Sequence, residues 1–160
     1  MPNLPKMYID EKSVDTLRAA VENQGKWIYF LTMEGMERGL DSTFAKEAMY
    51  ALGRYYADTE FKDCNTPEEL GSRLMRRSLE QGSEASISQD EGQIHLKIGY
   101  CPMLHLWEQL TDDPAKYRLL CDIGCEMYRG MAEGRGLILE KKEALAAGCD
   151  HCTLCFRKAL

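Results

Sequence analysis

The sequence lacks a long apolar run, an apolar leader and an excess of basic residues. No stretch of about eighteen apolar residues occurs in the 160-residue chain, so we expect no transmembrane helix. The first residues, Met1 to Lys6, contain no apolar segment of the secretory type, which predicts a cytoplasmic location. The formal charge of -6 argues against a nucleic-acid partner, because phosphate binding requires a basic surface.

The chain also lacks internal repeats, linkers and low-complexity tracts. Its mass of 18.3 kDa suits one domain with a sizeable core, and its 44% hydrophobic and 29% charged content is typical of a globular protein. We therefore expect residues 1–160 to form a single domain.

Residues 1–82 are predicted to be mainly helical. Ser13 can cap a first helix that ends near Gly25, and the apolar run from Lys26 to Gly39 suggests a second, buried helix. Asp41 or Ser42 begins a third helix. The sequence Thr66-Pro67-Glu68-Glu69 is a strong start signal for a fourth, which should run to about Gln81.

Residues 83–160 change from helical to alternating periodicity and predict a sheet with interleaved helices. Residues 84–100 alternate around the turn sequence Asp90-Glu91-Gly92, which indicates a β-hairpin. Helices should begin at Cys101-Pro102 and Asp113-Pro114, and strands are expected over residues 136–142 and 152–157. The predicted class is α+β, a helical N-terminal half packed on a small antiparallel sheet.

The number of cysteines is the one unusual feature of the composition. Seven are present, five of them after residue 120. An odd number in a chain without a secretory leader argues against a disulfide framework, and it favours thiols, metal ligands or core residues.

Cys101 is a candidate reactive thiol because it lies where a strand turns into a helix. The amides at that helix N-terminus favour a thiolate, and His105 lies one helical turn further on. The alternative is that Cys101 is a small core residue and His105 faces solvent.

Cys121 and Cys125 are also one helical turn apart and could share a metal ion, or they could simply line a helix packed on the sheet. Asp122 lies beside the predicted apolar stripe of this helix. If buried, it would need a partner, and a proton-transfer role would follow.

The run from Cys149 to Cys155 has the C-x-x-C spacing of iron–sulfur loops. If residues 152–157 form a strand, however, Cys152 and Cys155 point to opposite faces and cannot share an ion. A zinc or iron site built from a smaller set of ligands is the remaining metal hypothesis. Its candidate ligands are Cys121, Cys125, Cys149, Cys152 and His151.

Three segments resemble the L-2-amino-thiazoline-4-carboxylic acid hydrolase family, which is itself distantly similar to 4-vinyl-reductase-type ligand-binding domains. The segments are GYCPMLHL (residues 99–106), LLCDI (119–123) and LILEKKEALAAGCDHCTLCFR (137–157). The shared pattern places Cys101 before a proline, Cys121 beside an acid, and Gly148, Cys152 and Phe156 near the C-terminus. Because the resemblance joins these places, it implies that Cys101, Cys121 and Cys152 converge within one pocket or its floor.

The resemblance implies ring-opening hydrolysis of a cyclic amidine that carries a carboxylate, with N-carbamoyl-cysteine as the product. Such a reaction needs a nucleophile, a base, an acid for the departing sulfur and a cation for the carboxylate. The implied nucleophile is Cys101 or Cys152, the base Asp122, and the acid His105 or His151. Arg118 or Arg129 could bind the carboxylate.

Two other functions fit the sequence. One is a non-catalytic module that senses a small molecule or a metal through the cysteine-rich half, and the other is a protein-interaction domain with structural cysteines. A homo-oligomer is compatible with either.

Overall fold

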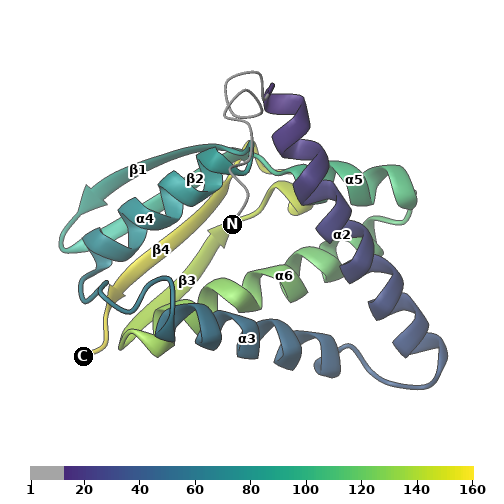
Figure 1. Ribbon diagram of the computed structural model, residues 1–160, viewed down its shortest axis with the longest axis horizontal. Helices are drawn as coiled ribbons and strands as arrows, with labels where there is room; N and C mark the ends of the chain where they lie inside the picture. Colours follow the sequence, from purple (N-terminus) through teal and green to yellow (C-terminus); the bar gives the residue numbers. More distant parts are fainter. Residues whose placement is uncertain (1–12) are drawn as a thin grey trace, which may run out of the picture.

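The computed structural model describes residues 13–160, and in that part of the chain five α-helices accompany one four-stranded sheet (Figure 1). The elements are α2 (Val14–Glu37), α3 (Thr43–Asp58), α4 (Pro67–Glu80), β1 (Glu84–Asp90), β2 (Gln93–Tyr100), α5 (Pro102–Leu110), α6 (Pro114–Gly134), β3 (Leu137–Glu143), a short 3-10 turn (Leu145–Ala147) and β4 (Cys152–Lys158). Three helices precede the first strand, which confirms the predicted α+β class. No helix in the described residues is both long and apolar enough to cross a membrane.

The helix starts follow the local capping signals. At α4, the Thr66 side chain accepts a hydrogen bond from the Glu69 amide while the Glu69 carboxylate accepts one from the Thr66 amide, a reciprocal capping box. Asp41 Oδ1 accepts a hydrogen bond from the Thr43 amide at the start of α3. Both starts are confirmed, as is the end of α4 at Gln81.

The sheet is antiparallel throughout, in the order β1-β2-β4-β3. Glu91 and Gly92 have φ values of 45° and 76°, the left-handed conformation that a two-residue hairpin turn requires. The predicted pairing of the three strand regions in one sheet is confirmed. β4 lies between β2 and β3, so its inward residues are central to the core.

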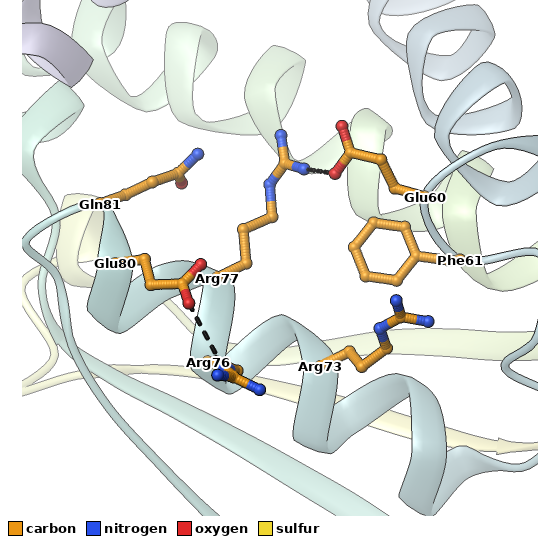
Figure 2. Close-up of a pocket in the computed structure, with 7 residues that line it drawn as sticks. All are labelled: Glu60, Phe61, Arg73, Arg76, Arg77, Glu80 and Gln81. Carbon is orange, nitrogen blue, oxygen red and sulfur yellow. Dashed lines mark hydrogen bonds and ion pairs between the residues drawn. The ribbon is translucent and has the colours of Figure 1, made fainter. Parts of the chain in front are cut away.

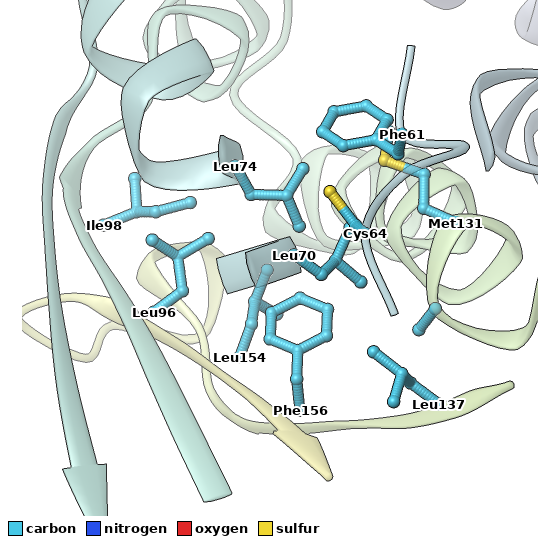
Figure 3. Packing of buried hydrophobic residues seen from close by; sticks show 11 residues of the cluster. Phe61, Cys64, Leu70, Leu74, Leu96, Ile98, Met131, Leu137, Leu154 and Phe156 are labelled. Atoms are coloured by element: carbon cyan, nitrogen blue, oxygen red, sulfur yellow. The ribbon is translucent and has the colours of Figure 1, made fainter. Parts of the chain in front are cut away.

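One face of the sheet is covered by α4 and α6, which lie on the same side (Figures 1 and 3). Leu70 and Leu74 of α4 and Met131 of α6 pack on Leu154 and Phe156 of β4. A second, smaller core joins α2, α5 and α6 around Leu106, Trp107 and Leu120. The candidate site lies between these two cores.

α3 and α6 cross at very close range because glycines stand at the contact. A Cβ atom on Gly53 would lie 2.0 Å from the Met127 carbonyl oxygen, and one on Gly130 would lie 2.2 Å from the Tyr50 carbonyl oxygen. Backbone therefore packs on backbone here, and this contact fixes how α6 lies against the rest of the fold.

The prediction that a helix ends at Gly25 is wrong. α2 continues through this position without a break, and Gly25 is buried against α5. A Cβ at Gly25 would lie 3.1 Å from Leu106 Cδ2, and the Trp107 indole donates a 2.9 Å hydrogen bond to the Gly25 carbonyl. The glycine thus serves a close helix contact rather than a helix end.

Residues 26–37 are helical, as predicted, but the prediction that this segment is buried is wrong. Ile28 and Met33 pack against α5, but Trp27, Phe30 and Leu31 are 63%, 59% and 70% exposed. α2 lies at the periphery of the molecule (Figure 1), so only one of its faces meets another element.

Candidate functional site

Four of the seven cysteines line one partly enclosed, mainly apolar cavity of about 100 Å³ between the two cores. Cys101 comes from the corner between β2 and α5, Cys121 and Cys125 from successive turns of α6, and Cys152 from the first position of β4. The predicted convergence of Cys101, Cys121 and Cys152 is therefore found. The other lining residues are Val21, Met49, Gln81, Ser83, Ile98, Pro102, Met103, Trp107, Gly124, Met127, Tyr128 and Leu154.

Cys101 occupies the N-cap position of α5, with Pro102 as the first helical residue. Burial raises the pKa of the Cys101 thiol, and the backbone amides of Leu104 and Met103 oppose that rise. Helix position alone therefore does not make this thiol acidic, because desolvation outweighs the nearby amides.

Cys121 differs from the other three cavity thiols. Hydrogen bonding from Cys125 lowers the pKa of Cys121, burial opposes this, and the positive charge of Lys141 lowers it further. The pKa of the partner Cys125 is correspondingly raised. Cys121 is thus the cavity thiol with the most thiolate character.

Lys141 supplies that positive charge from β3. It lies opposite Leu154 in the sheet, so its side chain points to the helix-covered face, toward α6. There Lys141 Nζ contacts Asp122 Oδ1 at 2.5 Å. The Asp122 side chain is 54% exposed and does not line the cavity, so the buried acid that the sequence allowed is not found. Its field also acts on Cys125 and Cys152. Lys141 was not among the residues expected at the site, although it continues the inward alternation of Leu137 and Leu139.

Cys152 is a weakly acidic thiol. Its Sγ accepts a 3.3 Å hydrogen bond from the Leu145 amide, yet burial raises its pKa to about 11. Leu154 and Phe156 share its face of β4, whereas Cys155 on the opposite face donates to Gln93 Oε1 at 2.9 Å. Cys152 and Cys155 therefore point away from each other, as the strand pattern predicts.

His105 is exposed and does not line the cavity. It lines an outer hollow of about 170 Å³ with Tyr100, Glu108 and Cys101, and its Nε2 contacts Gln109 Nε2 at 2.9 Å. Cys101 lines both spaces. It therefore forms the wall between the surface hollow and the interior cavity.

The two arginines implied as carboxylate ligands lie outside the cavity lining. Arg118 Nε donates to the Ala146 carbonyl oxygen at 3.0 Å. Arg129 binds Glu126 and Glu133 and stacks over the Tyr50 ring at 4.5 Å. Both guanidinium groups are engaged elsewhere.

The metal ligands predicted from the sequence do not assemble. Cys149 is exposed, and His151 Nε2 contacts Glu143 at 2.9 Å, whereas Cys121, Cys125 and Cys152 lie at the cavity. Across residues 13–160, no group of three or more histidine, cysteine or acidic side chains is placed to hold an ion. The geometry does not support the metal hypothesis.

A larger hollow of about 550 Å³ lies on α4, lined by Arg73, Arg76 and Arg77 (Figure 2). Arg76 pairs with Glu80 at 3.3 Å, and Arg77 pairs with Glu60. Because two of the three guanidinium groups are neutralised within the hollow, we regard it as a surface ion-pair network rather than a site.

Comparisons with known proteins agree with the fold. The chain is similar to the trafficking protein particle complex subunit 3 from Naegleria fowleri covalently bound to palmitic acid, with a TM-score of 0.64, 14% identity, and coverage of 89% of this chain and 97% of that one. At this identity the likeness concerns the fold alone. Among curated proteins, no sequence matches.

The family model for L-2-amino-thiazoline-4-carboxylic acid hydrolase matches residues 14–156, a range that includes every residue lining the cysteine cavity. Because the match spans nearly the whole chain, the protein belongs to the L-2-amino-thiazoline-4-carboxylic acid hydrolase family.

Proposed function

We propose that this protein is a thiol-dependent hydrolase that opens a small cyclic amidine, such as 2-amino-thiazoline-4-carboxylate, in the cysteine cavity. The observation that carries the proposal is the placement of Cys121 at the cavity wall beside the Lys141–Asp122 pair. Family membership supplies the substrate class.

The size of the cavity supports a small ring as the ligand. An apolar cavity of about 150 Å³ is known to bind a single benzene molecule. A volume of about 100 Å³ therefore suits a five-membered ring rather than a long chain.

In this proposal Cys121 is the nucleophile, in place of Cys101 or Cys152. Those two thiols have raised pKa values and are protonated near neutral pH, whereas the pKa of Cys121 is lowered. Lys141 is the cation whose charge lowers the pKa of Cys121, and in this proposal it replaces Arg118 and Arg129 in attracting the substrate carboxylate, acting from outside the cavity lining.

The reaction balances without an oxidant or a cofactor. The Cys121 thiolate adds to the amidine carbon, the bond from that carbon to the ring sulfur breaks, and the sulfur leaves with the bonding pair. Water then adds to the same carbon, and the bond to Cys121 breaks to restore the thiolate. One water proton ends on the ring nitrogen and the other on the released sulfur, giving N-carbamoyl-cysteine. We propose that the water proton passes to Asp122, which is adjacent to Cys121 in sequence but is 54% exposed and lies outside the cavity lining.

The test is the release of thiol from 2-amino-thiazoline-4-carboxylate, counted with a disulfide reagent and confirmed by mass spectrometry of the product. Cys121→Ser should abolish turnover, whereas Cys155→Ser should retain it, because Cys155 lies on the opposite face of the sheet. Folded wild-type protein that releases no thiol would contradict the proposal.

A second candidate function is ligand binding without turnover, and the composition of the cavity favours it. Within residues 13–160, no charged side chain lines the cavity, and the structurally similar trafficking subunit is covalently bound to palmitic acid. A short acyl group in thioester linkage to a cavity cysteine would be its counterpart here. Intact-mass analysis of purified protein, before and after hydroxylamine, tests this alternative: an added mass that hydroxylamine removes supports it, and an unmodified mass contradicts it.

A further inference from the structure

α2 carries an apolar stripe that no described element covers. Trp27, Phe30 and Leu31 follow i, i+3, i+4 spacing and are each more than half exposed. The opposite face of the helix makes the contacts with α5 through Gly25 and Ile28. The stripe is therefore additional to the face that the fold itself uses.

The exposed apolar area is comparable to the largest apolar patch on a typical monomer, a patch that is often functional. A large aromatic side chain can bury about 150–250 Å², so these three side chains together present roughly 350 Å² of apolar surface. Contiguous apolar patches of a few hundred Å² mark interaction sites more often than ordinary surface.

The charged residues that flank the stripe can form ion pairs with the same residues of a second copy. At about 100° per residue, Lys26 and Glu37 fall on the same flank of α2, about eleven residues apart. In a two-fold antiparallel pair of helices, each flank meets the same flank of the partner helix. With the axis near Leu31, Lys26 of one copy therefore faces Glu37 of the other, and the pair occurs twice.

We propose that α2 is the interface of a homodimer, in which the Trp27–Phe30–Leu31 stripe packs antiparallel against the same stripe of a second copy. Two stripes and their polar flanks would bury on the order of 1,200 Å² in total, the lower end of the range for specific interfaces. A pair of this size forms a reversible dimer rather than an obligate one. The cysteine cavity lies on the other side of α2, where Val21 lines it, so both surfaces can be used at once.

The test measures the mass of the full chain by sedimentation equilibrium over a range of concentrations up to about 1 mM. Wild type should shift from monomer to dimer. Phe30→Glu should raise the dimer Kd at least tenfold, because it places a charge at the centre of the stripe. Tyr55→Glu is the matched control, since Tyr55 is a similarly exposed aromatic residue on α3, and it should leave the Kd unchanged.

A charge exchange tests the antiparallel geometry. Lys26→Glu alone and Glu37→Lys alone should each raise the Kd about fivefold, because each places like charges opposite one another. The double variant should restore the wild-type Kd to within about twofold. A wild-type protein that stays monomeric throughout, or a double variant weaker than both single variants, overturns the proposal.

Discussion

Gly130→Ala should destabilise the protein even though alanine is the better helix former. In an exposed helix interior, replacing glycine by alanine gains about 1 kcal/mol. At Gly130 the new methyl carbon would lie 2.2 Å from the Tyr50 carbonyl oxygen and 3.0 Å from the Arg54 amide nitrogen. Both are backbone atoms of α3, so no side chain can turn away and the two helices must separate.

The cost of this clash exceeds the gain in helix propensity. Overpacking in a well-packed contact costs about 1–3 kcal/mol, and a rigid backbone neighbour places Gly130 at the upper end. The expected net loss is about 2 kcal/mol after subtraction of the propensity gain. For a chain of this length, that loss lowers Tm by roughly 4–8 °C.

Gly124→Ala is the matched control, because Gly124 is also in α6 and its nearest atom, in the Trp107 ring, would lie at an ordinary 3.8 Å. This variant should be neutral or up to about 1 kcal/mol more stable. Urea unfolding followed by circular dichroism measures both variants and wild type. If Gly130→Ala proves as stable as Gly124→Ala, the close crossing of α3 and α6 is wrong.

Four further results are expected. Thr66→Ala should lower the free energy of unfolding by about 1 kcal/mol in the same urea titration, because it removes the side-chain acceptor of the α4 capping box. Phe156→Ala should lower it by about 3–5 kcal/mol, since this ring is fully buried in the main core. Asp122→Asn should reduce turnover of the thiazoline by about a hundredfold or more, the usual effect of losing a general base. In per-cysteine alkylation measured by mass spectrometry, Cys121 should lose reactivity at a lower pH than Cys152 does, because the pKa of Cys121 is lowered while that of Cys152 is about 11; Lys141→Met should move the Cys121 profile to higher pH.

Much of the fold could be predicted from the sequence because its signals are local. The capping box at Thr66, the turn at Glu91 and Gly92, and the alternation through β2 each involve residues a few positions apart. Such signals can be recognised without knowledge of the tertiary contacts, and the observed bounds of the helices and strands lie close to those predicted from them.

The misreading of α2 has a non-local cause. Gly25 resembles a helix end, but its role is a contact with Trp107, which lies 82 residues away. The exposure of Trp27, Phe30 and Leu31 likewise depends on where α5 lies, since α5 can cover only one side of an apolar helix. An apolar run predicts that a helix has apolar faces, and it does not say how many of them the monomer covers.

At the candidate site, too, one feature could be predicted from the sequence and another could not. The convergence of Cys101, Cys121 and Cys152 could be predicted from the family resemblance, which joins these three positions, and it is found in the structure. Their relative acidity could not be predicted, because it depends first on the hydrogen bond between Cys125 and Cys121, and further on Lys141, which neither lines the cavity nor belongs to the cysteine pattern. An inward lysine on a strand is costly unless it is paired, and here the pair is Asp122 on α6. The same ion pair that makes Lys141 tolerable also holds a positive charge near Cys121, Cys125 and Cys152, and this charge adds to the hydrogen bond from Cys125 in lowering the pKa of Cys121. A residue outside the cavity lining therefore contributes to the chemistry of the thiols inside it.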